Sequence, residues 1–233
     1  MLPAGSVDKE GFYHVLGTDS WGRDMLTQLM YGARVAILVP VAVQALACIM
    51  GTILGMICGY YKKADFVISR IMEAFHAIPT LVLCMLICEL LGKGTFQLIL
   101  SLAIDGTIGV ARMIRGQVLS IRQEEYIECE KVIGASDFRT LIKHVLPALY
   151  NTLIVRFTTG LSGTLLSMVG LAFVSVGLNI QIPNWGLQVA LGRGNFILQP
   201  YLTLYPAICI IITTFAFCLI GDGMRSVIGS GRS

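Results

Sequence analysis

Long apolar stretches alternate with shorter polar segments along most of this sequence. A stretch of about 20 apolar residues is long enough to cross the ~30 Å hydrocarbon core of a bilayer as a helix. The second and third of five such stretches are the least uniform, because each contains polar residues. The pattern predicts an all-α protein with about five membrane-spanning helices, at residues 35–61, 74–91, 95–111, 150–178 and 202–221.

The composition agrees with a membrane protein. Hydrophobic residues make up 55% of the 233 residues and charged residues only 13%, against about 25% in soluble domains. The mean hydropathy is +0.77. The net charge of +3 is too small, and the basic residues are too scattered, to predict binding to nucleic acid. Six of the seven cysteines lie in apolar stretches, where we expect them to pack as small side chains rather than bind a metal.

Glycines recur at every fourth position near the end of the first apolar stretch, at Gly51, Gly55 and Gly59. This spacing places all three along one ridge of a helix. Small residues on such a ridge let a second helix approach closely in a membrane. We therefore predict that the ridge packs against another helix.

The distribution of basic residues predicts the orientation of the chain. With alternating spans, one side of the membrane receives eleven Lys and Arg residues and the other side receives five. Because the side with more basic residues is normally cytoplasmic, residues 112–147 and the C-terminus are expected in the cytoplasm. Five spans then place the N-terminus outside.

Residues 112–147 form a long polar segment between two apolar stretches. Gly134 is placed to end one helix as a C′ glycine, and Ser136 or Asp137 is placed to cap the next. Apolar residues then recur at helical spacing as far as Pro147. The segment is predicted to form a helix–turn–helix in the cytosol that is joined to the next membrane helix.

Four residues of this segment stand at a recognisable spacing: Glu128, Gly134, Leu146 and Pro147. Their spacing is similar to the EAA loop of ATP-binding-cassette (ABC) importer permeases, E-A-A-x3-G-x9-I-x-L-P. The sequence departs from the motif at three positions, because Cys129 and Glu130 replace the two alanines and His144 replaces the isoleucine. In that family the loop forms the coupling helices, which sit in a groove of the ATPase subunit.

Further short motifs occur before and after this segment. They are GTDxxGRD from residue 17, YGAR from residue 31, ARxxRGQxL from residue 111, GAS from residue 134, PNWG from residue 183 and GDGMR from residue 221. In this order they resemble the dipeptide, oligopeptide and nickel permeases over nearly the whole chain. Members of that family normally have six helices with both termini inside, whereas the pattern here predicts five.

The resemblance implies a domain organisation and a set of partners. Residues 1–34 are expected to form an extracytoplasmic segment with an interfacial helix, and residues 35–233 the permease domain in the lipid bilayer. The implied partners are a second homologous permease, two ABC ATPase subunits that bind ATP and Mg²⁺, and an extracytoplasmic solute-binding protein. Because the sequence has no G-x4-G-K-[ST] phosphate loop, we expect the chain to bind no cofactor and to be no enzyme itself.

The resemblance also assigns candidate site residues. The residues expected to couple to the ATPase are Glu128, Gly134, Ala135, Ser136, Asp137, Leu146 and Pro147. In the last outer loop, Pro183, Trp185 and Gly186 are expected to face the solute-binding protein. These two groups lie on opposite sides of the predicted membrane.

Asp105 is the most unusual residue within a predicted span, because a carboxylate near the bilayer interior costs ~2.5–3.5 kcal/mol on insertion scales. It could line the pore and attract a cationic group of the cargo. It could equally be solvated or hydrogen-bonded within the helix bundle. The sequence alone favours neither interpretation.

The cargo and the driving force each have alternatives. Within the resembled family, the cargo could be a peptide or nickel, and peptide is preferred since Met and Cys are ordinary residues in membrane helices. An ion-coupled secondary transporter is a further alternative, because Asp105 and Glu89 lie in predicted spans. An intramembrane enzyme is disfavoured by the lack of paired histidines or a nucleophile set.

Overall fold

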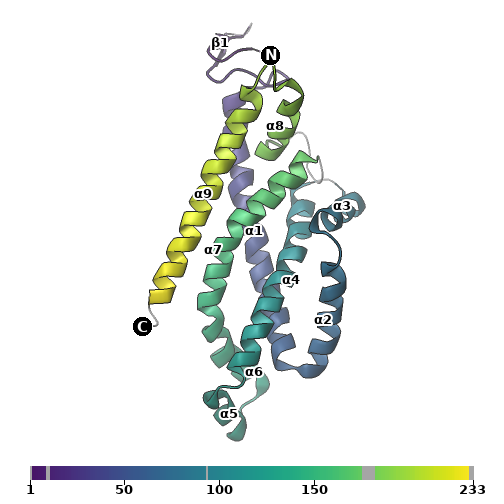
Figure 1. Cartoon of the computed structure of the whole chain (residues 1–233), viewed down its shortest axis with the longest axis vertical. Coiled ribbons are helices and arrows are strands. Elements are labelled where there is room, and N and C mark those ends of the chain that lie inside the picture. Colours follow the sequence, from purple (N-terminus) through teal and green to yellow (C-terminus); the bar gives the residue numbers. More distant parts are fainter. Residues whose placement is uncertain (1, 9–10, 93, 175–181, 231–233) are drawn as a thin grey trace.

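The computed structural model describes residues 2–8, 11–92, 94–174 and 182–230. Helices dominate these ranges, so the predicted all-α fold is confirmed (Figure 1). The elements are β1 (Ser6–Val7), β2 (Tyr13–His14), α1 (Met25–Tyr60), α2 (Lys62–His76), α3 (Thr80–Leu91), α4 (Thr95–Ile121), α5 (Glu125–Val132), α6 (Asp137–Thr140), the π-helix η1 (Leu141–Val145), α7 (Leu146–Phe173), α8 (Trp185–Gly192), the 3₁₀ turn η2 (Arg193–Asn195) and α9 (Tyr201–Ser230).

Four helices of the described chain are long and apolar enough to cross a membrane. They are α1, α4, α9 and the continuous helix of α6, η1 and α7. The pair α2 and α3 meets the same criterion only when taken together, and its two helices are bent by 92°. Pro79 stands directly before α3, and a proline disfavours helical backbone in the residue before it. The protein is therefore polytopic, with a fifth span if the bent pair crosses as one.

The helices are longer than the apolar stretches that predicted them. α1 begins at Met25 rather than near residue 35, because the side chain of Asp24 caps it by accepting a hydrogen bond from the N–H of Thr27. Residues 25–34 therefore extend α1 and form no separate interfacial helix. α4 continues ten residues past Ala111 to Ile121, and α9 extends past residue 221. The expected fourth span reaches residue 178, and residues 175–178 lie outside the described ranges.

The glycine ridge of α1 packs directly on α4, as its spacing predicted. A Cβ atom at Gly51 would lie 2.6 Å from the Cβ of Val110, and one at Gly59 would lie 2.5 Å from the Cβ of Val118. Gly55 meets Ile114 in the same way, at 2.7 Å. Because such distances exclude any side chain, the glycines fix how closely the two helices approach. This contact holds the lower halves of α1 and α4 together.

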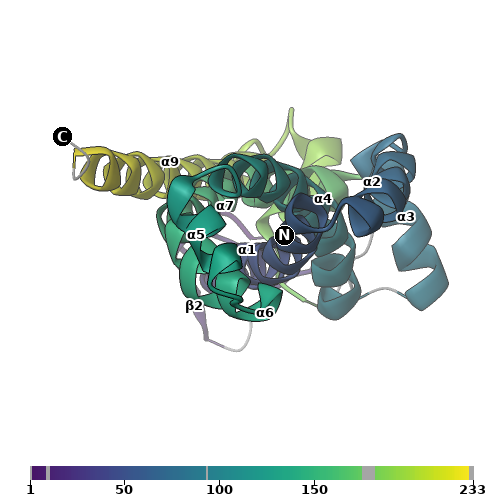
Figure 2. The ribbon, with the colours of Figure 1, turned by 90° about the horizontal axis from the view of Figure 1, so that it is seen from below.

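The molecule is elongated, and its two ends carry different elements. The β1–β2 hairpin and α8 lie at the upper end of Figure 1, and α5 and α6 lie at the lower end. Seen from the lower end in Figure 2, α9 reaches away from the other helices. Large apolar side chains of α9 are exposed, among them Ile211, Ile212 and Phe215. Such a surface suits contact with lipid or with another membrane helix.

Candidate functional site

The α5–α6 hairpin, defined as residues 125–145, closes the lower end of the molecule. Gly134 has a φ of +78°, in the left-handed region that favours glycine. The N–H of Ala135 donates to the carbonyl of Glu130 at 3.0 Å, which is the long hydrogen bond of a Schellman motif with Gly134 at C′. The predicted stop at Gly134 is therefore confirmed, and it turns the chain back toward the bundle.

The second arm of the hairpin is continuous with a membrane helix. Ser136 caps α6, since its hydroxyl accepts a hydrogen bond from the N–H of Arg139 at 3.4 Å. α6 then passes through η1 into α7, and Leu146 and Pro147 form the first turn of α7. A π-helical turn leaves room around the missing N–H of a proline and often marks a functional site. Force applied to α6 would therefore reach α7 without an intervening loop.

Tyr60, the last residue of α1, anchors the hairpin to the bundle. Its hydroxyl donates to Asp137 Oδ1 at 2.9 Å, and its carbonyl accepts a hydrogen bond from Arg122 Nη1 at 2.9 Å. Ile127 of α5 is fully buried in the same cluster as Val145 of η1. Asp137 itself remains exposed, so this hydrogen bond ties it to the bundle at the protein surface. Sequence reasoning missed Tyr60, because nothing local to residue 60 indicates a contact 77 positions away.

The outer side of the hairpin is apolar and exposed. Val132 is 87% exposed, and Ile133 and Phe138 are each 74% exposed. Glu128 is exposed on α5 beside them. Several large apolar side chains exposed on one short, otherwise polar segment are typical of a protein-binding surface. We call Val132, Ile133 and Phe138 the apolar tip.

Glu130 and His144, two residues that differ from the EAA motif, contact one another. His144 Nε2 lies 3.2 Å from Glu130 Oε1, so η1 and α5 are linked across the hairpin. The motif has small or apolar residues at both positions. The sequence shows that both residues are polar where the motif is not. Their positions in the sequence alone could not show that the two side chains meet.

Asp105 lies in the upper half of α4 and faces α3. Its Oδ1 accepts a hydrogen bond from the hydroxyl of Thr80, the first residue of α3, at 3.1 Å. The carboxylate is partly exposed. The contact joins the bent pair to α4, and it accounts for one of the hydrogen bonds that a carboxylate at this depth requires.

The residues expected to face a binding protein lie at the upper end. Asn184 caps α8, Trp185 is only 5% exposed, and its Nε1 donates to the carbonyl of Leu29 at 2.9 Å. Gly186 is buried against α7, where a Cβ would lie 2.7 Å from that of Ala172. Pro183 is partly exposed. Trp185 and Gly186 therefore hold α8 in place, and a partner would meet the surface that they position.

A pocket of about 240 Å³ opens at this upper end, between α8 and the turn before α1. Asp19 and Arg23 line one side, and the Nε of Arg23 donates to Asp19 Oδ2 at 2.7 Å. Gln188 of α8 lines the other side, and its amide nitrogen and oxygen have no hydrogen-bond partner among the described residues. The motif before α1 and α8 therefore build one surface, although they are far apart in sequence.

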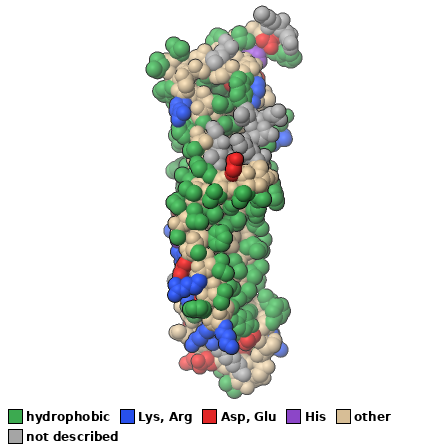
Figure 3. Space-filling model, turned by 90° about the vertical axis from the view of Figure 1, so that its right-hand side faces the viewer, with side chains coloured by type: hydrophobic (Ala, Val, Ile, Leu, Met, Phe, Trp, Pro, Cys, Tyr) green, Lys and Arg blue, Asp and Glu red, His purple; other side chains and the backbone are tan. Residues whose placement is uncertain are grey.

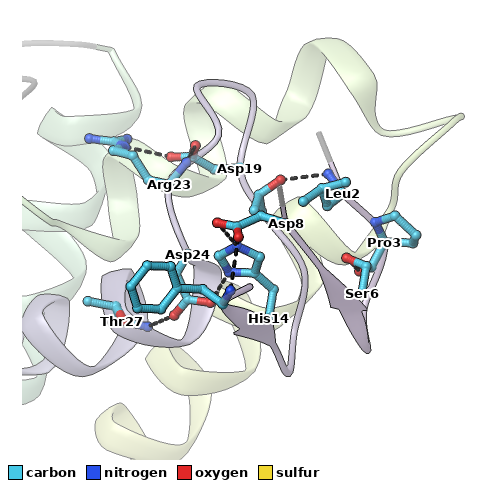
Figure 4. Close-up of polar contacts among 11 residues, drawn as sticks. Leu2, Pro3, Ser6, Asp8, His14, Asp19, Arg23, Asp24 and Thr27 are labelled. Atoms are coloured by element: carbon cyan, nitrogen blue, oxygen red, sulfur yellow. Dashed lines mark hydrogen bonds and ion pairs between the residues drawn. The ribbon is translucent and has the colours of Figure 1, made fainter. Parts of the chain in front are cut away.

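His14 connects the N-terminal hairpin to α1 (Figure 4). Its Nδ1 donates to Asp24 Oδ1 at 2.9 Å, and its Nε2 lies 3.4 Å from Asp8 Oδ2. The hydrogen bond to Asp24 raises the pKa of His14, with Asp8 adding to the effect. Burial alone would raise the pKa of Asp24, but hydrogen bonds from His14 and Thr27 outweigh it and the pKa is lowered. We call His14, Asp8 and Asp24 the N-terminal clip.

Side chains that could bind a metal ion do not cluster within the described residues. In those ranges no group of three or more His, Cys, Asp and Glu side chains is placed to hold a metal ion. What the geometry does define is a polytopic membrane protein with an anchored hairpin at one end and a pocket at the other.

Comparison with known proteins identifies the family. Residues 51–232 match the family described as "Binding-protein-dependent transport system inner membrane component", and the chain belongs to it. It is therefore a permease subunit of an ABC importer, as the motifs indicated.

Curated relatives match almost the entire chain. The glutathione transport system permease protein GsiD of Pectobacterium atrosepticum is 30% identical over 92% of this chain and 72% of its own length. A putative peptide transport system permease protein of Brucella suis is 33% identical over 94% of this chain and 74% of its own length.

Solved structures with a similar fold are also ABC transporters. A chain of the inward-facing MetNI methionine ABC transporter matches with a TM-score of 0.71 at 16% identity, over 88% of this chain and 97% of that chain. An amino acid ABC transporter crystallised with histidines matches with a TM-score of 0.54 at 17% identity, over 87% of this chain and 92% of that chain. At these identities the likeness concerns the fold.

Proposed function

We propose that this permease imports peptides and that separate ATPase subunits drive it through the α5–α6 hairpin. The peptide cargo rests on the relatives, which are named as glutathione and peptide permeases. Glutathione is itself a small peptide, so the two names agree in chemical class. Nickel was the alternative cargo, and none of the relatives named above favours it.

The apolar tip is the observation that carries the coupling role. Three large side chains at 74–87% exposure lose contact with water only if a partner covers them. Behind them, Tyr60, Asp137 and the buried Ile127 hold the hairpin firmly on the bundle. A partner that binds the exposed apolar tip could therefore move the hairpin together with the helices to which it is fixed. Glu128 adds one negative charge at the edge of this surface.

The remaining partners follow from the two ends of the molecule. With the hairpin in the cytosol, the pocket beside α8 opens on the opposite side, where a solute-binding protein would deliver cargo. The exposed apolar side of α9 would face a second permease or lipid. Alternating access would follow when ATP-driven closure of the ATPases moves the hairpins and, through them, α7. ATP and Mg²⁺ would bind only to the ATPase subunits.

A matched pair of substitutions tests the coupling role. Phe138→Asp places a charge on the apolar tip, whereas Phe12→Asp places the same charge on the upper end, where Phe12 is 65% exposed. We expect Phe138→Asp to reduce the amount of ATPase that co-purifies with the permease by roughly 30-fold, because losing a central apolar contact costs ~2 kcal/mol. ATP-driven peptide uptake should fall with it.

The control variant Phe12→Asp should retain the ATPase. Equal retention in Phe138→Asp and the unsubstituted protein would contradict the coupling role. Uptake that continues without ATP would instead support an ion-coupled transporter. A co-purifying binding protein that holds nickel would overturn the peptide assignment alone.

A further inference from the structure

An apolar groove runs along the side of the molecule between α2 and α4. Its volume is about 320 Å³, and α1 forms its floor. The groove is lined almost completely by apolar side chains, including Met50 of α1, Phe75 of α2 and Ile104 of α4. Figure 3 shows a broad apolar band on the side of the molecule where α2 lies. A groove of this kind inside a membrane must be filled by something apolar.

A polar pocket continues the groove toward the lower end. It has a volume of about 170 Å³ and is lined by Ser69 and Glu73 of α2 and by Arg112 and Arg115 of α4. Met72 lines both the groove and the pocket, so the two are contiguous. Basic side chains gather on the lower part of the same face in Figure 3.

Of the charged side chains that line the polar pocket, one basic side chain has no acidic partner among the described residues. Arg115 donates two hydrogen bonds to Asp65, from Nε at 2.5 Å and from Nη2 at 2.6 Å. Glu73 accepts a hydrogen bond from Arg70 at 2.9 Å. Arg112 is exposed and forms no ion pair or hydrogen bond with any of the described residues. The pocket therefore presents one uncompensated guanidinium group, at the end of an apolar groove.

The dimensions fit a single lipid chain. From Leu100, at the upper end of the groove, to Arg112 the helix rises about 18 Å at 1.5 Å per residue. One leaflet of a ~30 Å hydrocarbon core is about 15 Å thick. A chain that occupies the groove would thus end near the middle of the bilayer, while its headgroup lies beside Arg112.

We propose that this slot between α2 and α4 binds an anionic phospholipid. Its acyl chain fills the groove, and its phosphate accepts hydrogen bonds from Arg112. Basic pockets between membrane helices are known to select anionic headgroups, and the planar guanidinium group matches a phosphate oxygen pair. The bound chain would also support α2, which has few contacts with α4 apart from the Asp65–Arg115 pair.

A tryptophan reporter tests the proposal in the full chain, purified with its accompanying subunits. Phe75→Trp places a fluorophore in the groove. Its fluorescence is obtained by subtracting the tryptophan fluorescence of the unsubstituted protein. Vesicles contain phosphatidylglycerol or phosphatidylcholine with brominated chains, which quench tryptophan on contact. We expect phosphatidylglycerol to quench at about fivefold lower mole fraction, equivalent to ~1 kcal/mol for one basic residue near a membrane surface.

Variants on this reporter background separate the slot from general surface charge. Arg112→Gln should abolish the preference, and Arg112→Lys should keep most of it. Lys63→Gln removes the same charge from the exposed start of α2, outside the pocket, and should change the preference far less. Thr107→Phe fills the groove and should reduce quenching by both lipids.

Two results would contradict the proposal. A reporter that neither lipid quenches would mean that protein covers the groove. If Arg112→Gln preferred phosphatidylglycerol as strongly as the reporter with Arg112, Arg112 would not select the headgroup. Either result overturns the proposal.

Discussion

Glu130 and His144 show how two single residues can adapt a shared loop. A carboxylate and an imidazole contact each other at 3.2 Å, at positions where the family motif has an alanine and an isoleucine. Both side chains are mostly buried, at 17% and 25% exposure. The pair lies at ion-pair distance but without the geometry of a hydrogen bond, and losing one partner would leave the other polar group buried alone, which costs more than losing both. The pair therefore acts as one unit.

The pairing predicts non-additive substitutions. Glu130→Ala and His144→Ile should each lower the thermal stability of the purified subunit, whereas the double variant should recover most of the loss. A coupling free energy of about 1 kcal/mol is expected from the thermodynamic cycle, within the range for contacting residues. Additive effects of the two substitutions would show that the side chains act independently.

The N-terminal clip predicts a dependence on pH. The raised pKa of His14 means that its contribution to folding is complete below the ordinary histidine value of 6.5 and is lost as the pH rises through the raised value. The lowered pKa of Asp24 means that its contribution is complete above 3.8 and is lost as the pH falls through the lowered value. The clip should therefore be tightest between about pH 4 and 6.5.

Limited proteolysis of residues 2–24 as a function of pH measures this effect. Cleavage should be slowest in the mildly acidic range and should increase toward neutral pH and above. In His14→Gln the increase should largely disappear, because the imidazole that loses its proton as the pH rises is then absent. A rate of cleavage that stays constant from pH 5 to 8 in the unsubstituted protein would contradict the assignment of His14.

At the scale of helices, local chemistry predicted some boundaries and missed others. The stop at Gly134 and the cap at Ser136 could be predicted because a glycine C′ and a serine N-cap act within a few residues. The extension of α4 to Ile121 could not be predicted in this way. Ile114 and Val118 support it because they are buried against the glycines of α1, and that contact exists only in the folded chain. Apolar length alone therefore underestimates helices that continue beyond the predicted spans.

Some features of the candidate site could likewise be predicted from the sequence, and others could not. The positions of Gly134, Ser136, Leu146 and Pro147 in the turn and the helix start follow from the sequence, whereas the hydrogen bond between Asp137 and Tyr60 does not. Trp185 was expected to face a partner, but the close approach of Gly32 creates the space in which it is buried. Contacts between residues that are distant in the sequence decide which side of an element is available, and one sequence does not contain them.

Gly134 offers a test at this scale. Gly134→Val should force a β-branched residue into a left-handed conformation, at a cost of roughly 1–3 kcal/mol, although a Cβ there meets nothing within 4 Å. The hairpin should change direction, so ATP hydrolysis should be uncoupled from uptake while the subunit still inserts. Gly116→Val is the control, because that glycine also has open space but lies within α4. Full transport by Gly134→Val would refute the role of this turn.

At the scale of the whole molecule, one rod connects the hairpin to the upper part of the bundle. The continuous helix of α6, η1 and α7 contains 37 residues, which corresponds to about 55 Å. Its lower end carries Phe138 of the apolar tip, and its upper part contacts α8, which lines the pocket beside Asp19 and Arg23. A displacement of the hairpin would therefore be transmitted along α7 toward the upper end of the molecule.

The measurement that tests this account most directly is cross-linking from the apolar tip. Phe138→Cys, in a chain whose native cysteines are replaced by serine or alanine, would be treated with a cysteine-reactive cross-linker in membranes that contain the assembled transporter. Phe12→Cys at the opposite end serves as the control. We predict that Phe138→Cys captures an ATPase subunit with a yield that changes when ATP is added, and that Phe12→Cys captures none. Labelling of Phe138→Cys by a membrane-impermeant reagent from outside the cell, or failure to capture any ATPase, would contradict the account.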